Sequence, residues 1–163
     1  MYRRACLADV AAVRRVGEAS YPPHFRESDA TVAAIIALGL SWVYSNNAHE
    51  VVGYALVQKT VSIENPPHLN ATAAVGSHVF IHDVCVLPAH RSCGIGKALA
   101  YHALASATHL VSLVSLEGAV WFWVQIGFTP YQGTTVWDYR TEYGDEAMLM
   151  CATISPHSQS LQT

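Results

Sequence analysis

The segment at 79–87 is apolar almost without interruption and constrains the fold more than any other part of the chain. A strand with one solvated face alternates apolar and polar residues, whereas a strand buried on both faces is a continuous apolar run. We therefore expect this segment to lie inside a sheet that has helices on both faces. His82 and Asp83 are its only polar residues, so each of them needs a hydrogen-bond partner or a function.

Strand-like and helix-like patterns alternate along the rest of the chain, which predicts a mixed α/β fold. Strands are expected at 2–6, 42–45, 51–58, 79–87, 110–114, 134–139 and 147–153. Helices are expected from Asp9 onward, where valines recur at helical spacing, and at 29–38, 94–107 and 117–125. Pro22 and Pro23 separate the first two helices because proline cannot continue a helix. The segment 60–76, which holds Pro66 and Pro67, is expected to be a loop.

The composition of the 163 residues fits one globular domain, because 52% are hydrophobic and only 13% are charged. We expect that domain over 1–153 and a flexible tail over 154–163. The net charge of −3 argues against a nucleic-acid binder, which usually carries a basic face. The cysteines show no CxxC spacing, and neither a secretory signal nor a long apolar segment is found. These features predict a cytoplasmic protein with reduced thiols.

A glycine-containing segment at 91–97 joins the apolar strand to an alanine-rich helix. It is not a P-loop of the form GxxxxGK(S/T), because Arg91 stands in place of the first glycine and Ala98 in place of the hydroxyl residue. Nor is it the dinucleotide fingerprint GxGxxG, because Leu99 holds the third glycine position. Successive N–H groups at the start of the helix would form a site for a phosphate, with an ordinary loop before a helix as the alternative.

Two blocks of the sequence resemble motifs of a known family. HDVCVLPAHRSCGIGKALA at 82–100 resembles motif A of the GCN5-related N-acetyltransferase (GNAT) superfamily, and WFWVQIGF at 121–128 resembles its motif B. The resemblance implies an α+β fold with a mostly antiparallel sheet of about seven strands, splayed between strands 4 and 5 and flanked by about four helices. Within the superfamily the chain is similar to the arylalkylamine N-acetyltransferase branch. That similarity is carried by Tyr21-Pro22-Pro23 with Glu27, Gly53-Tyr54, 66–70, Ile81-His82-Asp83 and 115–123.

The same resemblance implies that the chain binds acetyl-CoA. The pantetheine arm would pair with the main chain of Val84, Cys85 and Val86, and the N–H of Cys85 or Val86 would face the acetyl oxygen. The diphosphate would lie on the loop formed by Arg91, Ser92, Cys93, Gly94, Ile95, Gly96 and Lys97. Phe122 and Trp123 are expected to pack against the coenzyme.

The polar residues of the apolar strand are the first candidate catalysts. Strand alternation places Asp83 and Cys85 on one face and His82 on the other. Asp83 is expected to act as general base, or else to cap a bulge or pair with a neighbouring strand, and His82 is a second candidate base. Asp83 and Cys85 stand where the arylalkylamine enzymes carry two catalytic histidines, which departs from that branch. His78 shares a face with His82, but no third ligand is suggested nearby, so no metal site is expected.

The group that protonates the departing thiolate is not the one that motif B usually supplies. Trp123 stands where the family usually has a tyrosine acid, and an indole cannot give up a proton at neutral pH. Tyr143, before the last expected strand, is therefore our hypothesis for this acid, with a packed surface tyrosine as the alternative. Cys85 as an acetyl-accepting nucleophile is disfavoured, because a buried thiol among apolar residues is usually inert.

The acceptor site is expected between the 21–29 segment and the loop at 60–76. Tyr21, Phe25 and Glu27 would form an aromatic wall with one negative charge, which suits a small amine, although Glu27 in the first turn of a helix is an equal alternative. The sequence therefore predicts an acetyl-CoA-dependent N-acetyltransferase that acts on a primary amine by direct attack in a ternary complex. The alternative is a catalytically silent module that binds or senses acyl-CoA. A monomer or a homodimer is expected.

Overall fold

Seven strands form one mixed sheet in the computed structural model of the chain, which describes residues 1–72, 76–107 and 109–154. Their order is β1-β2-β3-β4-β5-β7-β6, and only the neighbours β4 and β5 are parallel. The strands are β1 (Tyr2–Arg4), β2 (Trp42–Ser45), β3 (Val51–Thr60), β4 (His78–Val86), β5 (Leu110–Ser115), β6 (Thr129–Pro130) and β7 (Met148–Thr153). The helices are α1 (Val10–Glu18), α2 (Asp29–Ala37), α3 (Ile95–Leu104), α4 (Val120–Ile126) and α5 (Arg140–Tyr143), with short 3-10 turns at Leu7–Asp9, Pro23–Phe25 and Pro88–His90.

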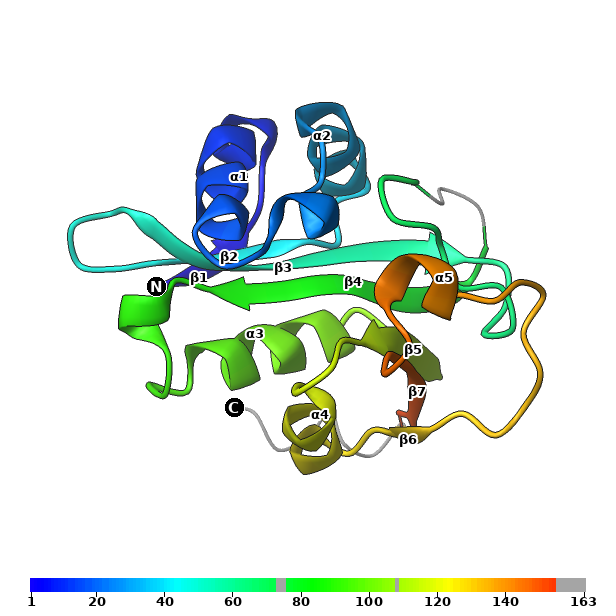
Figure 1. Cartoon of the computed structure of the whole chain (residues 1–163). Coiled ribbons are helices and arrows are strands. Elements are labelled where there is room, and N and C mark those ends of the chain that lie inside the picture. The colour runs from blue at the N-terminus through cyan, green and yellow to red at the C-terminus, as the bar shows by residue number, and fades with distance from the viewer. Residues whose placement is uncertain (73–75, 108, 155–163) are drawn as a thin grey trace.

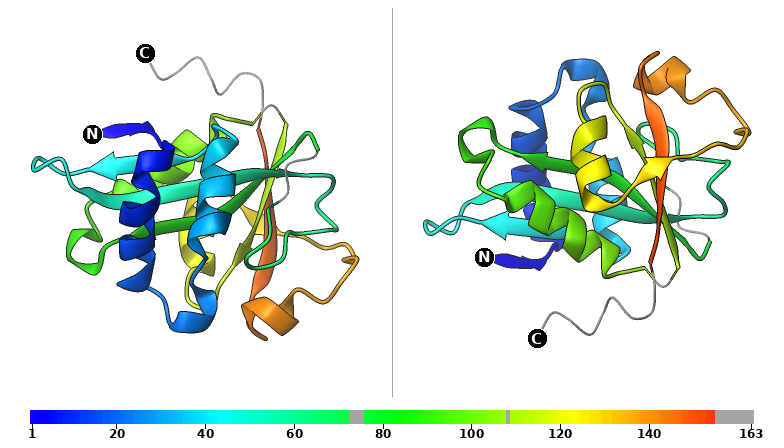
Figure 2. Two further views of the ribbon diagram at one scale, coloured as in Figure 1. Left: turned by 90° about the horizontal axis from the view of Figure 1, so that it is seen from above. Right: turned by 90° about the horizontal axis from the view of Figure 1, so that it is seen from below.

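Helices cover both faces of the sheet, as the apolar run at 79–87 predicts. Helices α1 and α2 lie on one face, and α3 and α4 lie on the other (Figure 1). Seen from above, α1 and α2 lie in front of the sheet, and seen from below, α3 and α4 lie in front of it (Figure 2). Strand β3 is buried along almost its whole length, because it lies between both helical layers.

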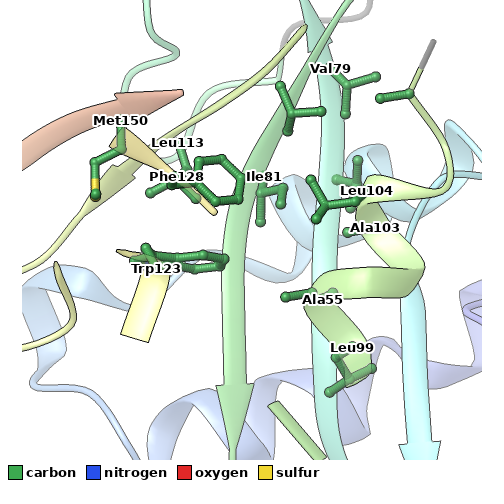
Figure 3. Packing of buried hydrophobic residues seen from close by; sticks show 14 of the residues in the cluster. Ala55, Val79, Ile81, Leu99, Ala103, Leu104, Leu113, Trp123, Phe128 and Met150 are labelled. Carbon is green, nitrogen blue, oxygen red and sulfur yellow. The ribbon is translucent and has the colours of Figure 1, made fainter. Parts of the chain in front are cut away.

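Each helical layer has its own core against the sheet. On one face, Leu99 and Ala103 of α3 belong to the same hydrophobic cluster as Ile81 of β4 and Phe128 (Figure 3). The alanines of α3 bring that helix close to the strands, since they add little volume between the two backbones. On the other face, valines and isoleucines of α1 and α2 pack on β2 and β3. Burial of one such side chain contributes about 1.5–3 kcal/mol, so the two layers fix the positions of β3 and β4 firmly.

Strands β4 and β5 separate soon after they pair. Their register contains only Val79 with Val111 and Phe80 with Ser112. Beyond Phe80, β4 continues to Val86 with β3 as its neighbour on one side, while β5 diverges on the other. The expected splay between the fourth and fifth strands is therefore confirmed. It leaves the β5-facing edge of residues 81–86 without a partner strand among the described residues.

A β-bulge interrupts the pairing of β4 with β3 at His82. Leu56 is opposite Asp83 and Val57 is opposite Ile81, so His82 is the extra residue. In such a bulge the two adjacent side chains lie on roughly the same side of the sheet. The prediction that alternation would place His82 and Asp83 on opposite faces is therefore wrong, and both side chains lie on the face covered by α1 and α2.

The predicted strand at 134–139 is also wrong. Those residues form turns and irregular backbone, and the place beside β7 is taken by β6, which pairs Thr129 with Cys151. The β-prone side chains of this segment are used differently: Trp137 and Tyr139 pack in a third cluster with Ile63. Tertiary packing therefore overrides local strand propensity here. Of the predicted tail, residues 155–163 lie outside the described residues.

Candidate functional site

A cavity of about 710 Å³ occupies the gap between β4 and β5. Its walls come from β4, β5, the start of α4, the segment before α2 and the segment that joins α5 to β7. The predicted site residues that line it are Tyr21, Phe25, Glu27, His82, Asp83, Val84, Trp123 and Tyr143. The structure thus brings all of the predicted catalytic and acceptor residues together around one space.

The two sides of this cavity differ in chemistry. On the side of α3 and α4, Ile81, Leu113 and Trp123 belong to the hydrophobic core. On the side of α1 and α2, the wall carries Tyr21, Glu27, His82 and Asp83. The splayed strands therefore separate an apolar half from a polar half, and a molecule in one half can reach a molecule in the other through the gap.

Asp83 is held by two tyrosine hydroxyls. Tyr21 donates to Oδ1 at 2.7 Å, and Tyr54 of β3 donates to Oδ2 at 2.6 Å. Burial raises the pKa of the Asp83 carboxyl, while the two tyrosine hydrogen bonds act in the opposite direction. The pKa values of Tyr21 and Tyr54 are raised as well, mainly by burial and then by the nearby Asp83 charge. Asp83 is thus the acceptor at the centre of a cluster in which burial raises the pKa of every member.

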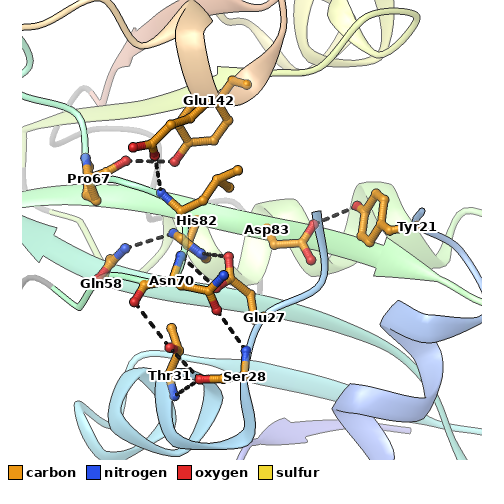
Figure 4. A network of polar contacts seen from close by, with 12 residues as sticks. Tyr21, Glu27, Ser28, Thr31, Gln58, Pro67, Asn70, His82, Asp83 and Glu142 are labelled. Atoms are coloured by element: carbon orange, nitrogen blue, oxygen red, sulfur yellow. Dashed lines mark hydrogen bonds and ion pairs between the residues drawn. The ribbon is translucent and has the colours of Figure 1, made fainter. Parts of the chain in front are cut away.

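His82 pairs with Glu27 rather than with Asp83. Its Nε2 lies 2.6 Å from Glu27 Oε1, and its Nδ1 lies 2.8 Å from the side-chain nitrogen of Gln58 (Figure 4). The His82 side chain is 1% exposed and the Glu27 side chain is 10% exposed. This pair forms because the bulge turns His82 toward the 21–29 segment, while Gln58 on β3 supports the ring from behind.

The loop that follows β3 closes the cavity wall through contacts to both sides. Asn70 donates its backbone N–H to Glu27 Oε2 at 2.9 Å and accepts from the backbone N–H of Ser28 at 2.8 Å (Figure 4). On the other side, Glu142 of α5 accepts from the backbone N–H of Leu69 at 2.9 Å and lies 2.7 Å from Nδ1 of His68. The loop therefore links the start of α2 to α5 beside the cavity, which Leu69 lines.

Tyr143 lies at the cavity but directs its hydroxyl elsewhere. The hydroxyl donates to the carbonyl oxygen of Pro67 at 2.7 Å, and the residue is 5% exposed. Burial raises the pKa of Tyr143 well above that of a free tyrosine, with further contributions from the charges of Glu27 and Glu142. The arrangement suits a residue that fixes the loop.

The glycine loop forms a cradle of unpaired N–H groups at the start of α3. Gly94 adopts a left-handed conformation with φ of 78°, and Ser92 does so with φ of 62°. The first backbone hydrogen bond that enters the helix joins Ala98 to Gly94 at 3.0 Å. Within the described part of the chain, the N–H groups of residues 92–97 have no acceptor. Such a row of free donors at a helix N-terminus fits a phosphate.

Two cationic side chains lie near this loop. Arg91 donates from Nε to the carbonyl oxygen of Val86 at 3.0 Å, which ties the loop to the end of β4. Lys97 places its ammonium group 5.9 Å from the centre of the Tyr101 ring. Together they add positive charge beside the unpaired N–H groups, so the cradle is electrostatically suited to a diphosphate.

The open edge of β4 presents the main chain of Val84 and Val86. Leu87 donates its N–H to Val52 of β3 at 2.9 Å, and in an antiparallel pair every second residue faces the same partner. The N–H of Cys85 therefore also faces β3, so that of Val86 is the better placed of the two groups we expected to face an acyl oxygen. The Cys85 side chain is buried, with Sγ 3.8 Å from the carbonyl oxygen of Val16.

Phe122 and Trp123 connect the cradle to the cavity. The Phe122 ring lies under the loop, within 3.7 Å of the point where a side chain on Gly96 would begin. The Trp123 ring is 7% exposed and packs edge-on against Phe122 and Phe128, with ring centres 4.9 Å and 5.4 Å apart. Trp123 is thus a rigid apolar wall of the cavity.

Sequence reasoning missed several residues that build the site. Tyr54 and Gln58 lie on the same face of β3 and reach Asp83 and His82, while Asn70 orients Glu27. The available signal was the position of Tyr54 and Gln58 four residues apart in an otherwise apolar strand, since buried polar groups need partners. No such signal exists for Asn70. Among the described residues no cluster of histidine, cysteine and carboxylate side chains is arranged to hold a metal ion, and no helix could cross a membrane.

Comparison with known proteins adds an independent observation. Residues 11–128 match the model of the acetyltransferase (GNAT) family. A search of curated protein sequences found no match. Among solved structures, the GphF GNAT-like decarboxylase in complex with isobutyryl-CoA superposes with a TM-score of 0.79 at 16% identity, over 94% of this chain and 98% of that chain.

Two further solved structures have the same fold. Rv2747 from Mycobacterium tuberculosis, in complex with CoA and NLQ, gives a TM-score of 0.73 at 19% identity, over 95% of this chain and 99% of that chain. Naa50 of Arabidopsis thaliana, in complex with the bisubstrate analogue CoA-Ac-MVNAL, gives 0.68 at 17% identity, over 94% and 98%. At these identities the likeness concerns the fold alone.

Proposed function

Because the chain belongs to the acetyltransferase (GNAT) family, we propose that it transfers an acetyl group from acetyl-CoA to a primary amine, by direct attack in a ternary complex. The observation that carries this proposal is the cavity at the splay, which has an apolar half, a polar half and an open strand edge between them. Such a space can hold a thioester and an amine side by side. The arylalkylamine branch remains a prediction.

The coenzyme would lie along the apolar side. Its diphosphate would accept hydrogen bonds from the N–H groups of residues 92–97, with Arg91 and Lys97 adding positive charge. Its pantetheine arm would pair with the open edge of β4 at Val84 and Val86, as an added strand does. The thioester would then reach the gap beside Trp123.

Main-chain N–H groups on this edge supply the electrophilic assistance. When an amine attacks the thioester, negative charge develops on the carbonyl oxygen. The N–H of Val86, which has no partner strand, is fixed in direction by the pairing of β4 with β3. A donor that is already aimed lowers the barrier without any reorganisation, and one such donor contributes about 2.7–4 kcal/mol in acyl transfer.

The acceptor would enter the polar half. The residues that line the cavity include the carboxylates of Glu27, Asp83, Glu117, Asp145 and Glu146 and no lysine or arginine. This wall favours a cation, so it supports an amine that arrives protonated. Tyr21 and Phe25 offer aromatic faces to the same group. A small acceptor is favoured because Leu69 and Tyr143 line the cavity and the bond from the Tyr143 hydroxyl to Pro67 holds that side closed.

The departing thiolate receives no proton from Trp123 or Tyr143 in this proposal. The indole is not an acid, and the Tyr143 hydroxyl donates to Pro67. We therefore assign protonation of the thiolate to solvent. The four cysteines are free thiols, which suits the cytoplasmic location that the sequence predicts.

The test measures release of free CoA from acetyl-CoA, with and without a panel of small primary amines. We expect release that depends on the amine, together with a product whose mass is greater by one acetyl group. The panel should include short peptides with free N-termini, because solved structures with this fold include the ribosomal-protein-S18-alanine N-acetyltransferase from Escherichia coli. Acetylation of peptides but of no small amine would contradict the small-molecule acceptor.

A second candidate function is supported by one observation, Trp123 at the place of the usual tyrosine acid. In that case the chain binds acyl-CoA and transfers nothing. Binding of acetyl-CoA by calorimetry without turnover of any amine or peptide would support this candidate and contradict the enzyme.

A further inference from the structure

A buried carboxylate–imidazole pair faces the polar half of the cavity and has no assigned task beyond substrate contact. Glu27 and His82 come from segments 55 residues apart in the sequence, and their closest atoms are 2.6 Å apart. With side chains only 10% and 1% exposed, the pair is shielded from bulk water. A carboxylate removed from bulk water needs hydrogen-bond donors, and His82 supplies one of them. The pair therefore places a carboxylate in a fixed position at the cavity, where an amine could reach it.

The hydrogen bonds of His82 determine which partner can accept a proton. The side-chain amide nitrogen of Gln58 is a donor, so His82 Nδ1 accepts from it. The ring proton then lies on Nε2, which donates to Glu27 Oε1. Both ring nitrogens are occupied in this arrangement, and no lone pair of the ring is directed at the cavity. His82 is therefore placed to orient Glu27 and is not itself available to an amine.

Glu27 is fixed from a second direction as well. Its Oε2 accepts from the backbone N–H of Asn70 at 2.9 Å. The Asn70 side chain in turn accepts from the N–H of Ser28, the residue that caps α2 through a 3.1 Å bond from Thr31 (Figure 4). The carboxylate thus has a set position on the cavity wall. Each of its oxygens accepts one of these bonds and keeps a further lone pair.

We infer that Glu27 is the catalytic group that accepts the proton of the acceptor amine, and that His82 is the positioning residue that orients it. The inference rests on the proposed function, since it concerns the same reaction. It replaces Asp83 as the expected base. Asp83 is assigned a structural role in this inference, because the Tyr21 and Tyr54 hydroxyls that donate to its two oxygens tie β4 to the 21–29 segment and to β3.

The step balances as follows. An ammonium group gives one proton to the Glu27 carboxylate and becomes a neutral amine. The nitrogen lone pair forms the C–N bond to the thioester carbon, and the C–S bond breaks with its electron pair on sulfur. The nitrogen then loses a second proton to solvent, and the thiolate takes one proton from solvent. Glu27 returns its proton to solvent before the next turnover.

Glu142 of α5, which contacts the same loop at Leu69, provides a control. Its carboxylate also contacts one histidine nitrogen, at 2.7 Å from His68, and one backbone N–H, at 2.9 Å from Leu69. The Glu142 side chain does not line the cavity. Replacement of either glutamate by glutamine therefore removes the same kind of structural contacts, and only one of the two removes a carboxylate from the cavity.

The test compares E27Q and E142Q in steady-state kinetics and thermal unfolding. E142Q should lower the melting temperature no more than E27Q does, because the Glu142 side chain is 34% exposed and the Glu27 side chain is 10% exposed. E27Q should reduce kcat by about 100-fold or more, with the KM for acetyl-CoA unchanged, whereas E142Q should stay within about 3-fold of the unaltered chain. Equal losses of kcat in both variants, or unchanged kcat in E27Q, would overturn the inference.

The pH profile of kcat/KM separates a proton acceptor from a structural carboxylate. The groups that face Glu27 are His82 and Asp83 of β4, Tyr21 on its own segment and Tyr143 of α5. The unaltered chain and Asp83→Asn should both show a kcat/KM that increases with pH, and E27Q should lack this increase. If Asp83→Asn lacks the increase and E27Q keeps it, Asp83 is the base.

Two substitutions of His82 test the positioning role. His82→Gln keeps a side chain that can donate to Glu27, whereas His82→Leu does not. His82→Gln should recover at least about 10-fold in kcat over His82→Leu, a partial rescue within the range of one acid–base contribution. Equal kcat in the two would contradict the assignment. If the unaltered chain acetylates no amine, the proposed function is wrong. If the unaltered chain acetylates an amine and E27Q has the same kcat, only the present inference is wrong.

Discussion

At the scale of single residues, the position of Cys85 removes the reactivity that a thiol in an active-site strand would otherwise have. Burial, followed by the nearby Asp83 charge, raises the pKa of this thiol to about 12. Only the thiolate is nucleophilic, so at neutral pH almost none of the reactive form is present. This supports direct attack by the amine over a scheme with an acetylated cysteine.

Alkylation measures how much less reactive Cys85 is than the exposed cysteines. We expect iodoacetamide at pH 8 to modify the exposed Cys6 and Cys93 in the folded protein and to leave Cys85 unmodified. Denaturation should expose all four thiols and make Cys85 react as fast as the others. Peptide mass spectrometry assigns each site, and rapid labelling of Cys85 in the folded chain would contradict the assignment of a buried, neutral thiol.

Asp9 is the residue for which a pH dependence of stability follows most directly. Arg3 donates to both of its oxygens at 2.7 Å, and the backbone N–H of Cys6 adds a third bond at 2.9 Å. The Arg3 hydrogen bond is the main reason that the pKa of Asp9 lies below its ordinary value of 3.8. A lowered pKa in the folded state means that this stabilisation is present above the ordinary value and is lost as the pH falls through the lowered one.

The corresponding variant is D9N. It should lower the free energy of unfolding by about 1–3 kcal/mol at pH 7, because a buried acceptor of three hydrogen bonds loses its charge and one of its oxygens. Urea unfolding at several pH values should show that the difference in free energy of unfolding between the unaltered chain and D9N stays constant from pH 7 to about pH 4. Below about pH 4 the difference should shrink, because Asp9 of the unaltered chain becomes protonated. A difference that grows on acidification would refute the assignment.

At the scale of elements, the sequence predicts the helices and strands that have a local pattern. It does not predict features that depend on contacts with residues far away in the sequence. The strand at 79–87, the glycine turn and the helix that follows it carry their own signals, and the structure has all three. The bulge at His82 is set by the register of β4 against β3, which no local pattern encodes. The pairing of Glu27 with His82 depends on that bulge, so it was not predictable either.

The C-terminal part of the sheet shows the same limit. Residues 134–139 have the composition of a strand, but Val136 donates its N–H to Glu64 of the loop after β3, and Trp137 donates from its ring to the Pro66 carbonyl. These contacts come from a segment about 70 residues away in the sequence. A single sequence does not reveal that this loop offers acceptors which compete with strand pairing.

The glycine turn before α3 permits a paired test of its role. Gly94 has φ of +78° and Gly39, after α2, has φ of +73°, and at both positions an added Cβ would meet no atom within 4 Å. Alanine at either position should therefore cost only the left-handed backbone penalty, about 1–2 kcal/mol.

Only one of the two substitutions should change the affinity for the coenzyme. G94A should weaken CoA binding by about 10-fold or more, because relief of the strain turns N–H groups out of the cradle; such a loss corresponds to about 1.4 kcal/mol. G39A should match G94A in stability and leave the affinity for CoA unchanged. Calorimetric titration measures the affinity, and equal affinity in the two variants would show that the diphosphate binds elsewhere.

At the scale of the whole molecule, two sections of sheet meet at a short junction. Among the residues that the structure describes, the section β1–β4 and the section β5, β7 and β6 share only the pairs Val79–Val111 and Phe80–Ser112. A coenzyme that pairs with the open edge of β4 would add contacts across this junction. The ligand should therefore stabilise the fold as a whole.

The expected size of this stabilisation follows from mass action. CoA at 100 times its dissociation constant should add about 2.7 kcal/mol to the free energy of unfolding. For a chain of 163 residues this corresponds to a rise of about 5–10 °C in melting temperature. Differential scanning calorimetry with and without CoA tests it, and dephospho-CoA, which keeps the diphosphate, should retain most of the shift. No shift at millimolar CoA would contradict the coenzyme site.

The strand order has a consequence for biosynthesis. Strand β7 lies between β5 and β6, so the middle of this section of sheet is supplied by residues that leave the ribosome after both of its neighbours. Until Met148–Thr153 emerges, β5 exposes a row of unpaired main-chain groups that other nascent chains can join. Chains released early by premature termination should therefore be insoluble and depend on chaperones, even though most of their sequence is already in place.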